Sequence, residues 1–359
     1  MTRPLPTQRI SGPAELLDAI PYLLGFHPTE SLVLIGVHAG LLGATARLDL
    51  TDTGQPDLVE HTVAALHRGG VDRLVVAVFD HRCEPPGAAL PSARPWQDAV
   101  SAVEDAARRV GSEIAEALLV CRGRWWSYLC DVADCCPSGG RPLAGAPSPY
   151  ALAATVDGVV ALPSRAALAR TLEPLPDARR AALEPLIAEA EHASVLAVLE
   201  DRLSSHNREL VRELMLAARG STADGWRPPD DATAARLAAA LTALPIRDEV
   251  WVAVDSRRLD GRPLWTDLGR RCPAPYDAAP LFLLGWASWR DGSGAIAGMA
   301  VERALASDPT YSAADLLLAA LDQAVDPRSF PRLTDAGFQP GVRGRRPRGR
   351  RVAVVRKPR

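Results

Sequence analysis

Runs of apolar residues separated by short polar or glycine-containing segments dominate the first 130 residues. The runs rich in branched side chains, which are typical of buried strands, lie at 31–38, 42–50, 71–80, 112–121 and 124–130. Ala39 with Gly40 separates the first two runs, and Arg122 with Gly123 separates the last two. The pattern therefore predicts five strands, four of them in two hairpins.

Two segments between these strands place their apolar residues at helical spacing. They cover 56–70 and about 95–110, and the glycines at 69, 70 and 111 are typical helix stop signals. The predicted order is strand, strand, helix, strand, helix, strand, strand. We therefore expect a mixed α/β sheet domain over residues 1–162.

Beyond Pro163 the apolar period becomes helical, which predicts an all-α domain over residues 163–335. Leucines at three-to-four spacing predict one packed helix face, formed by Leu196, Leu199, Leu203, Leu210 and Leu214. Between Ala278 and Tyr311 the spacing resembles one tetratricopeptide repeat, with small and breaker residues at Gly285, Ala297, Ala304 and Pro309. The expected C-terminal domain is therefore tetratricopeptide-like, with a helical hairpin packed on its neighbours; the alternative is a generic helix pair, which explains the spacing nearly as well.

Length and composition favour a cytoplasmic protein of two domains. The chain has 359 residues, of which 47% are hydrophobic, and no stretch approaches the roughly 20 consecutive apolar residues of a membrane-spanning helix. The first residues, "MTRPLPTQRI", lack the apolar block of a signal peptide. We expect no membrane association and, because the cytosol is reducing, six cysteine thiols.

The end of the chain is basic, although the formal net charge of the whole protein is only −2. After Gly341 every charged residue is Arg or Lys, so residues 336–359 are expected to form a basic disordered tail. The candidate polyanion-binding residues are Arg343, Arg345, Arg346, Arg348, Arg350 and Arg351. Such a tail could bind nucleic acid through its phosphates, or it could act only as a solvated tail that aids solubility.

Three of the six cysteines, Cys130, Cys135 and Cys136, lie within seven residues of one another. A tetrahedral zinc site needs four ligands, and this segment offers three thiols, two of them adjacent, and no histidine. The predicted hairpin places Cys83 and Cys121 at its turn, far from this segment, and the spacing lacks a Cys-X-X-Cys redox motif. We therefore expect a structural loop without a metal ion.

Polar residues gather at one edge of the predicted sheet because the first strand runs opposite to the next two. The candidate ligand-binding residues at this edge are His27, Ser31, Asp49, Asp80 and His81. Ligands of open α/β sheets favour the carboxyl ends of parallel strands, and a carboxylate can orient a neighbouring imidazole. The alternative is that Asp80 and His81 only close the turn that follows their strand.

The motifs of common enzymes and nucleotide-binding proteins are missing from the sequence. There is no Gly-X-Gly-X-X-Gly, no phosphate-binding loop ending in Gly-Lys-Ser/Thr, no His-Glu-X-X-His and no Gly-X-Ser-X-Gly. No cofactor is therefore expected, and the catalytic residues, if any, are not identified.

Several segments together resemble one known family. They are "PAELLDAIPYLLGFHPTESLVLIGV", "ARLDL", "RWWSYLC" with "CCP", "VALPSRAALA" and "GAIAGMAVERALASDPTYS". The combination is similar to the actinobacterial family called domain of unknown function 4192, over nearly the whole chain before the tail. The resemblance implies no activity, cofactor or catalytic residue, and it implies that the cysteine segment belongs to the family's ordinary architecture.

Three functions remain open from the sequence. The leading expectation is a non-catalytic binding or scaffold protein that binds a protein partner through its helical domain, because helical hairpins present grooves to partners. The first alternative is an enzyme of unassigned reaction with its pocket at the strand-exit edge of the sheet. The second alternative is a nucleic-acid-associated protein that acts through its basic tail.

Overall fold

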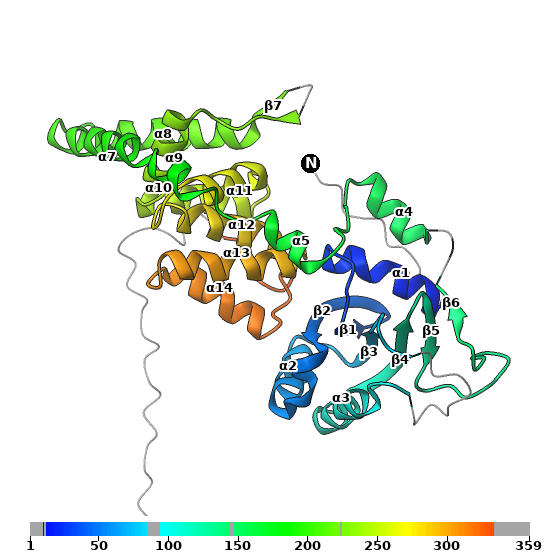
Figure 1. Cartoon of the computed structure of the whole chain (residues 1–359). Coiled ribbons are helices and arrows are strands. Elements are labelled where there is room, and N and C mark those ends of the chain that lie inside the picture. Colours follow the sequence, from blue (N-terminus) through cyan, green and yellow to red (C-terminus); the bar gives the residue numbers. More distant parts are fainter. Residues whose placement is uncertain are drawn as a thin grey trace, which may run out of the picture.

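A mixed sheet precedes a helix-rich region in the computed structural model, which describes residues 10, 12–84, 94–143, 145, 147–222 and 225–333 (Figure 1). The described strands of this sheet are β1 (Ser31–His38), β2 (Leu41–Asp49), β3 (Arg73–Phe79), β4 (Glu113–Cys121), β5 (Arg124–Ser127) and β6 (Arg141–Pro142). They are arranged in the order β2-β1-β3-β4-β5-β6. The predicted α/β sheet followed by a helical region is confirmed.

Strand β1 is antiparallel to both of its neighbours, whereas β3 and β4 are parallel. In this register Ser31, the first residue of β1, lies opposite both Asp49 of β2 and Phe79 of β3. The start of β1 therefore lies beside the ends of β2 and β3, as the sequence predicted. Strand β5 continues the sheet as the antiparallel neighbour of β4, and β6 pairs antiparallel with β5 at the edge of the sheet.

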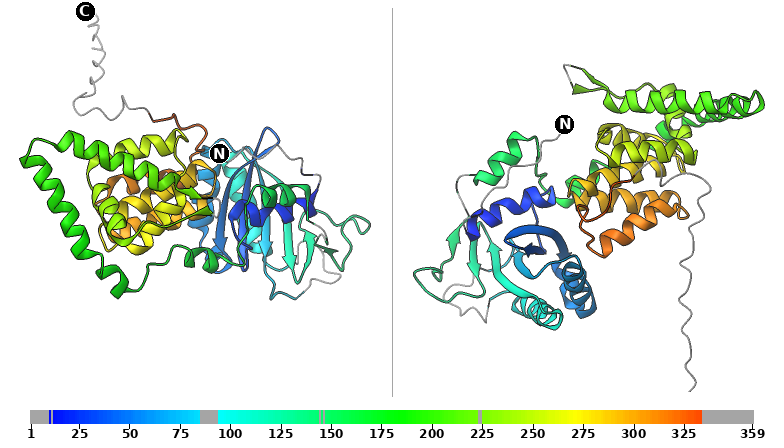
Figure 2. Two further views of the ribbon diagram at one scale, coloured as in Figure 1. Left: turned by 90° about the horizontal axis from the view of Figure 1, so that it is seen from above. Right: turned by 180° about the vertical axis from the view of Figure 1, so that it is seen from behind.

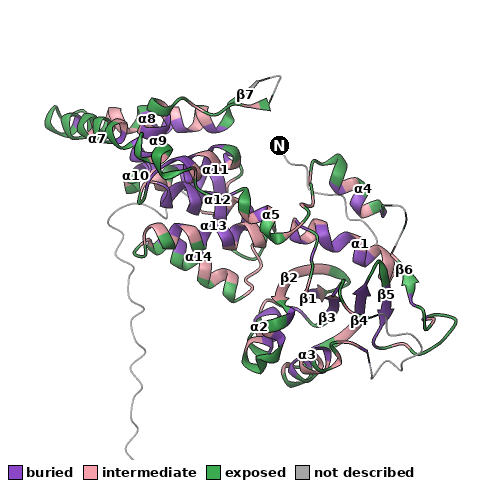
Figure 3. Ribbon diagram, in the orientation of Figure 1, coloured by how far each residue is buried: buried purple, intermediate pink, exposed green. Residues whose placement is uncertain are grey.

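Helices cover both faces of the sheet, as Figures 1 and 3 show. On one face, α1 (Pro13–Leu24) packs on alternate strand residues, among them Val33, Ile35, Val75, Ala77, Leu118 and Val120. On the other, α2 (Pro56–Arg68) and α3 (Gln97–Val110) pack on the intervening residues, among them Leu32, Leu34, Leu74, Val76 and Leu119. Because side chains alternate along a strand, a strand buried on both faces is apolar at nearly every position.

Helix α1 was not among the predicted helices, although it positions the candidate site. Pro13 occupies its first turn, where no intrahelical N–H is needed, and Gly25 ends it with a left-handed φ of 81°. Leu17 and Ile20 face the sheet and are almost fully buried. Each such side chain contributes roughly 1.5–3 kcal/mol by leaving water, so a short helix with Pro21 in its interior is held in place by tertiary packing.

The helix-rich region lies beside the sheet (Figure 2). Its helices in the described part are α4 (Pro149–Val156), α5 (Arg165–Arg170), α6 (Asp177–Ala181), α7 (Glu184–Leu199), α8 (Leu203–Arg219), α9 (Asp231–Ala240), α10 (Leu244–Asp255), α11 (Arg262–Arg271), α12 (Ala278–Arg290), α13 (Gly294–Ser307) and α14 (Ser312–Asp322). Short elements are the 3₁₀ helix η1 (Leu50–Gly54) and the hairpin β7 (Ser221–Thr222) and β8 (Gly225–Trp226). Among the described residues, no helix combines the length and the apolar composition that crossing a bilayer requires.

Helix α12 is the centre of the helical region because nearly all of its residues are buried. It packs against α13 at Gly285, where a Cβ atom would lie 2.8 Å from the side chain of Val301. Trp251 of α10 meets Phe282 edge-on with a ring-centroid distance of 4.8 Å. The predicted hairpin between 278 and 311 is therefore present as α12 and α13, while its kinship with a tetratricopeptide repeat stays a prediction.

The predicted leucine face between 196 and 214 is only partly present. The helix ends at Leu199 and a new one begins at Leu203, because Asp201 adopts a left-handed φ of 56°. Leu210 and Leu214 are buried, whereas Leu199 is 76% exposed. The leucine spacing correctly predicted helices on both sides of residues 200–202. Because the chain changes direction there, Leu196 and Leu199 of α7 face solvent instead of continuing the buried face of α8.

The domain boundaries at 162 and 335 stay predictions. Leu162 forms a parallel bridge with Phe26, next to the start of β1. The buried residues between α1 and the sheet also continue through Leu168 and Leu172 into the helical region. The predicted basic tail, with its six candidate arginines, lies outside the described residues.

A buried ion pair fixes the last described segment to the helical region. Asp255 is fully buried, and its Oδ1 accepts hydrogen bonds from Trp286 Nε1 at 2.9 Å and from Arg290 Nε at 2.5 Å. The guanidinium of Arg290 also donates to the carbonyl oxygens of residues 327, 330 and 331. One carboxylate and one guanidinium thus attach the chain after α14 to α10 and α12.

Replacing Asp255 with Ala should lower the free energy of unfolding by about 3–5 kcal/mol, because it leaves the Arg290 guanidinium buried without its counter-charge. Urea denaturation followed by tryptophan fluorescence measures this loss. The control is Asp105→Asn, which removes an exposed partner of Arg108 on α3 and should change the free energy by roughly 0.5 kcal/mol or less. Equal effects of the two substitutions would contradict the role given to the buried pair.

Candidate functional site

A pocket of ≈ 380 Å³ lies at the strand-exit edge of the sheet. The segment before β1 and the ends of β3 and β4 form its floor and sides, and α1 covers it. His27, Asp80 and His81 line it, so the structure brings three of the five predicted residues together. The apolar part of the wall consists of Leu17, Pro21, Phe79, Val120 and Leu143.

Asp80 is 9% exposed, and both of its carboxylate oxygens are already occupied. Oδ1 accepts hydrogen bonds from the backbone N–H groups of Arg82 at 2.9 Å and Cys83 at 3.1 Å. Oδ2 accepts one from Trp96 Nε1 at 2.8 Å. Asp80 therefore closes the turn after β3 and anchors the start of α3, and it orients no imidazole.

His27, His81 and Arg122 provide the uncommitted nitrogen-bearing side chains of the pocket. All three are exposed, and no described residue forms a hydrogen bond or an ion pair with their side chains. Arg122 occupies the turn between β4 and β5 with a left-handed φ of 47°. Two imidazoles and one guanidinium are thus free to meet a ligand.

Ser31 and Asp49 are held together beside the pocket but do not line it. The hydroxyl of Ser31, which is fully buried, donates to the carbonyl of Thr29 at 2.7 Å and accepts from Arg47 Nε at 2.8 Å. The guanidinium of Arg47 also pairs with Asp49 at 2.5 Å. These contacts join β1 to β2, so the two residues fix the edge on which the pocket is built.

Three polar residues of the pocket, Asp18, Thr29 and Arg122, were not predicted as site residues. Asp18 belongs to the unpredicted helix α1, and its Oδ2 accepts a hydrogen bond from the backbone N–H of Ser148 at 2.7 Å. Arg122 was identified only as a turn residue. Its position in the turn that joins the end of β4 to the start of β5 was the available signal, because a residue of that turn must lie beside the carboxyl end of β4.

The nitrogen-bearing side chains of the pocket have no protein partner among the described residues, whereas its carboxylates do. Both lining carboxylates, Asp18 and Asp80, accept hydrogen bonds from protein N–H groups. The nitrogen-bearing side chains without such partners are one guanidinium, which is positively charged, and two imidazoles, which can donate N–H groups to a ligand. A pocket of this size, with an apolar wall and a few polar groups, is typical of small-molecule sites.

Cys83 and Cys121 form a disulfide, so the expectation that all six cysteines are thiols is wrong for these two. Phe79 lies opposite Val120 in the parallel pairing of β3 and β4, which brings the two following segments to the same sheet edge. The Cα atoms of Cys83 and Cys121 are 6.1 Å apart, within the range that a disulfide requires. Their common location was predicted, but the bond was not.

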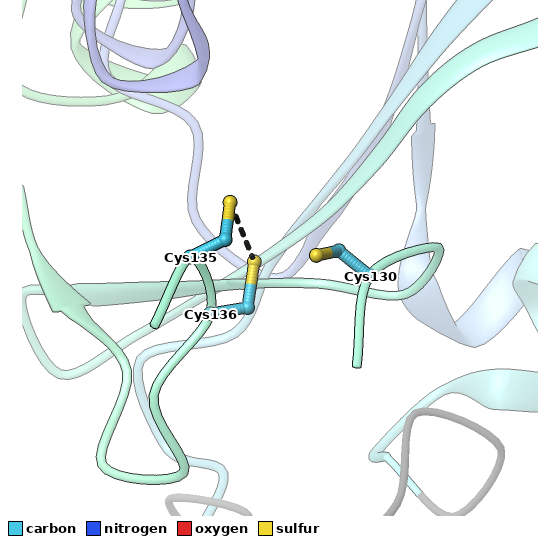
Figure 4. Close-up of side chains that lie close together, drawn as sticks. All are labelled: Cys130, Cys135 and Cys136. Atoms are coloured by element: carbon cyan, nitrogen blue, oxygen red, sulfur yellow. Dashed lines mark hydrogen bonds between the residues drawn. The ribbon is translucent and has the colours of Figure 1, made fainter. Parts of the chain in front are cut away.

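The segment between β5 and β6 gathers its three free thiols (Figure 4). The sulfur atoms of Cys130, Cys135 and Cys136 all lie within 4.8 Å of one another. The pKa of Cys130 is lowered, mainly by a hydrogen bond from the backbone of Val132, whereas burial raises the pKa of Cys136 to about 12. That this is a structural loop without a metal ion stays a prediction.

The fold and the site define an α/β domain with a strand-exit pocket, joined to a helical region. The chain belongs to the family described as Domain of unknown function (DUF4192), whose model matches residues 13–328. This match confirms the resemblance to that family and includes every residue of the pocket, while the actinobacterial origin stays a prediction. No curated protein and no solved structure matches the chain.

Replacing Asp80 with Ala should lower the free energy of unfolding by about 2–4 kcal/mol, because three N–H donors lose their acceptor. Asp80→Asn keeps one carbonyl oxygen for the two backbone donors and should cost less. Thermal and urea denaturation compare the two variants with the unchanged protein. Unchanged unfolding in Asp80→Ala would show that the carboxylate does not anchor this turn.

Proposed function

We propose that the N-terminal domain binds a small organic anion in the strand-exit pocket. The observation that carries the proposal is the set of three uncommitted side chains, His27, His81 and Arg122, around one cavity of ≈ 380 Å³. A phosphate or carboxylate group of the ligand would accept their hydrogen bonds. The ligand's apolar part would pack on Leu17 and Phe79.

Binding is better supported than catalysis by this arrangement. General acid–base chemistry usually depends on an imidazole or carboxylate held by a second group. Asp80 instead bonds to two backbone N–H groups and to Trp96, and no described residue orients the imidazole of His27 or His81. The enzymatic alternative therefore stays open, without a residue to which a catalytic role can be given.

A protein partner for the helical domain remains a second candidate function. Its specific support is a group of exposed apolar side chains at the end of α7, where Val195, Val198 and Leu199 are 55%, 56% and 76% exposed. Apolar side chains gathered on one exposed surface commonly mark interaction sites. Small-molecule binding and partner binding are compatible, because the two surfaces belong to different parts of the chain.

Two further expectations stay predictions within this proposal. Nucleic-acid binding would depend on the arginines after Gly341, which lie outside the described residues. A cytoplasmic location is supported by the four free thiols among six cysteines, since oxidising compartments favour paired cysteines. The bond between Cys83 and Cys121 argues in the opposite direction.

The pocket proposal predicts that replacing Arg122 with Asn weakens anion binding about 10- to 100-fold, because charge-assisted hydrogen bonds contribute roughly 1.5–3 kcal/mol. Asparagine tolerates the left-handed backbone at this turn. Isothermal titration calorimetry with inorganic phosphate and with citrate as probes measures the effect.

The matched control for this experiment is Arg73→Gln, which removes an exposed arginine at the opposite end of β3. This variant loses the same charge and should bind both probes like the unchanged protein. Equal weakening in the two variants would indicate only a general effect of net charge. That result, or no binding of either anion by the unchanged protein, would refute the proposed site.

A further inference from the structure

The cysteine segment between β5 and β6 is folded by contacts that do not involve the sulfur atoms. Arg124 donates to the carbonyl oxygens of Gly139 and Gly140 at 2.6 and 2.8 Å, and Trp126 Nε1 donates to Ser138 at 2.9 Å. Gly140 has a left-handed φ of 70°, and a Cβ there would lie 2.4 Å from the Trp126 ring. The loop therefore holds its shape before anything binds to its thiols.

Within this loop a short turn brings the side chains of Cys135 and Cys136 close to each other. The carbonyl of Val132 accepts hydrogen bonds from the backbone N–H groups of Cys135 at 3.0 Å and Cys136 at 2.6 Å. Their sulfur atoms are 3.9 Å apart, and Cys130 completes the group (Figure 4). Tetrahedral zinc with bonds of about 2.3 Å places neighbouring sulfurs about 3.8 Å apart, so the observed spacing suits one ion.

A buried guanidinium without partners lies beside the three thiols. Arg94 is only 6% exposed, and its Nε and Nη1 atoms have no hydrogen-bond partner among the described residues. Its electrostatic neighbours are Cys136, Tyr128, Cys130 and the carboxylate of Asp131. None of these groups accepts a hydrogen bond from the buried Nε and Nη1 atoms, and burying a charge without such bonds is costly, so further negative charge at the thiol cluster would stabilise Arg94.

Three thiolates and one divalent ion carry a net charge of −1, which a single guanidinium balances. Thiolate ligands select soft ions such as zinc over magnesium or calcium. A second pocket of ≈ 370 Å³, lined by all three cysteines, Glu116 and the start of α1, adjoins the sulfurs. A zinc ion with three protein ligands can thus take water or a small ligand as the fourth, as open zinc sites do.

We propose that Cys130, Cys135 and Cys136 bind one zinc ion, that Arg94 balances the charge of the three thiolates, and that the fourth coordination position opens into the second pocket. This site is separate from the strand-exit pocket. It also differs from the metal-free loop expected from the sequence, where the adjacency of two cysteines and the lack of a fourth ligand argued against zinc. In the structure the sulfur atoms of the two adjacent cysteines lie 3.9 Å apart, on the same side of the loop as Cys130.

Full-length protein, expressed with zinc in the medium and purified without chelator, should contain close to one zinc ion per chain by elemental analysis. After zinc removal under reducing conditions, Co²⁺ should produce thiolate-to-cobalt charge-transfer absorption. Cys135→Ser should reduce both signals, whereas Cys272→Ala, which changes a free cysteine elsewhere, should not. Circular dichroism verifies that both variants are folded.

Arg94→Met keeps a long side chain without the charge and should weaken zinc binding about 10- to 100-fold, the usual cost of losing a group that supports the ligands. Competition with a chromophoric chelator measures the dissociation constant. Negligible zinc together with no cobalt charge transfer would overturn the site, as would an unchanged metal content in Cys135→Ser. Unchanged affinity in Arg94→Met would overturn the role of that arginine.

Discussion

The antiparallel pairing of β1 with β3 is the constraint on which the rest of the candidate site depends. It places Ser31 opposite Phe79, so the segment that enters β1 lies beside the segment that leaves β3. A parallel β1 would put His27 and His81 at opposite ends of the sheet. Because β4 is parallel to β3, its turn residue Arg122 reaches the same edge, and three chain segments far apart in sequence supply one pocket.

Burial on both faces gives this edge its rigidity. The strands are covered by α1 on one side and by α2 and α3 on the other, and a one-residue shift in register would exchange the two apolar faces. His27, His81 and Arg122 are therefore held by a scaffold that their side chains do not stabilise themselves. Asp80 does stabilise it: its carboxylate accepts the hydrogen bonds of the turn after β3, which leaves the imidazoles without a carboxylate partner.

The sequence predicted β1 to β5, the directions of these strands and the shared location of His27, Asp80 and His81, because these features follow from the period of the apolar residues and from the rules for connecting strands. It did not predict β6 or the hairpin of β7 and β8. It missed α1, whose interior Pro21 and short length hide a helix that tertiary packing stabilises. It also missed Arg122 as a site residue and the convergence of the three thiols, since both depend on how turns fold. A single left-handed residue at Asp201 likewise divided the predicted leucine face, which no spacing of leucines could indicate.

The central claim is that the two imidazoles at the strand-exit edge meet the same anion, and NMR of protein labelled with ¹⁵N at its seven histidines tests it most directly. Variants His27→Gln and His81→Gln assign the two ring signals, and inorganic phosphate is then added at constant ionic strength. The account predicts that both signals move with one saturation curve, while the ring of His61, on the exposed side of α2, stays unchanged. Signals that do not move, or that follow two unrelated curves, would contradict it.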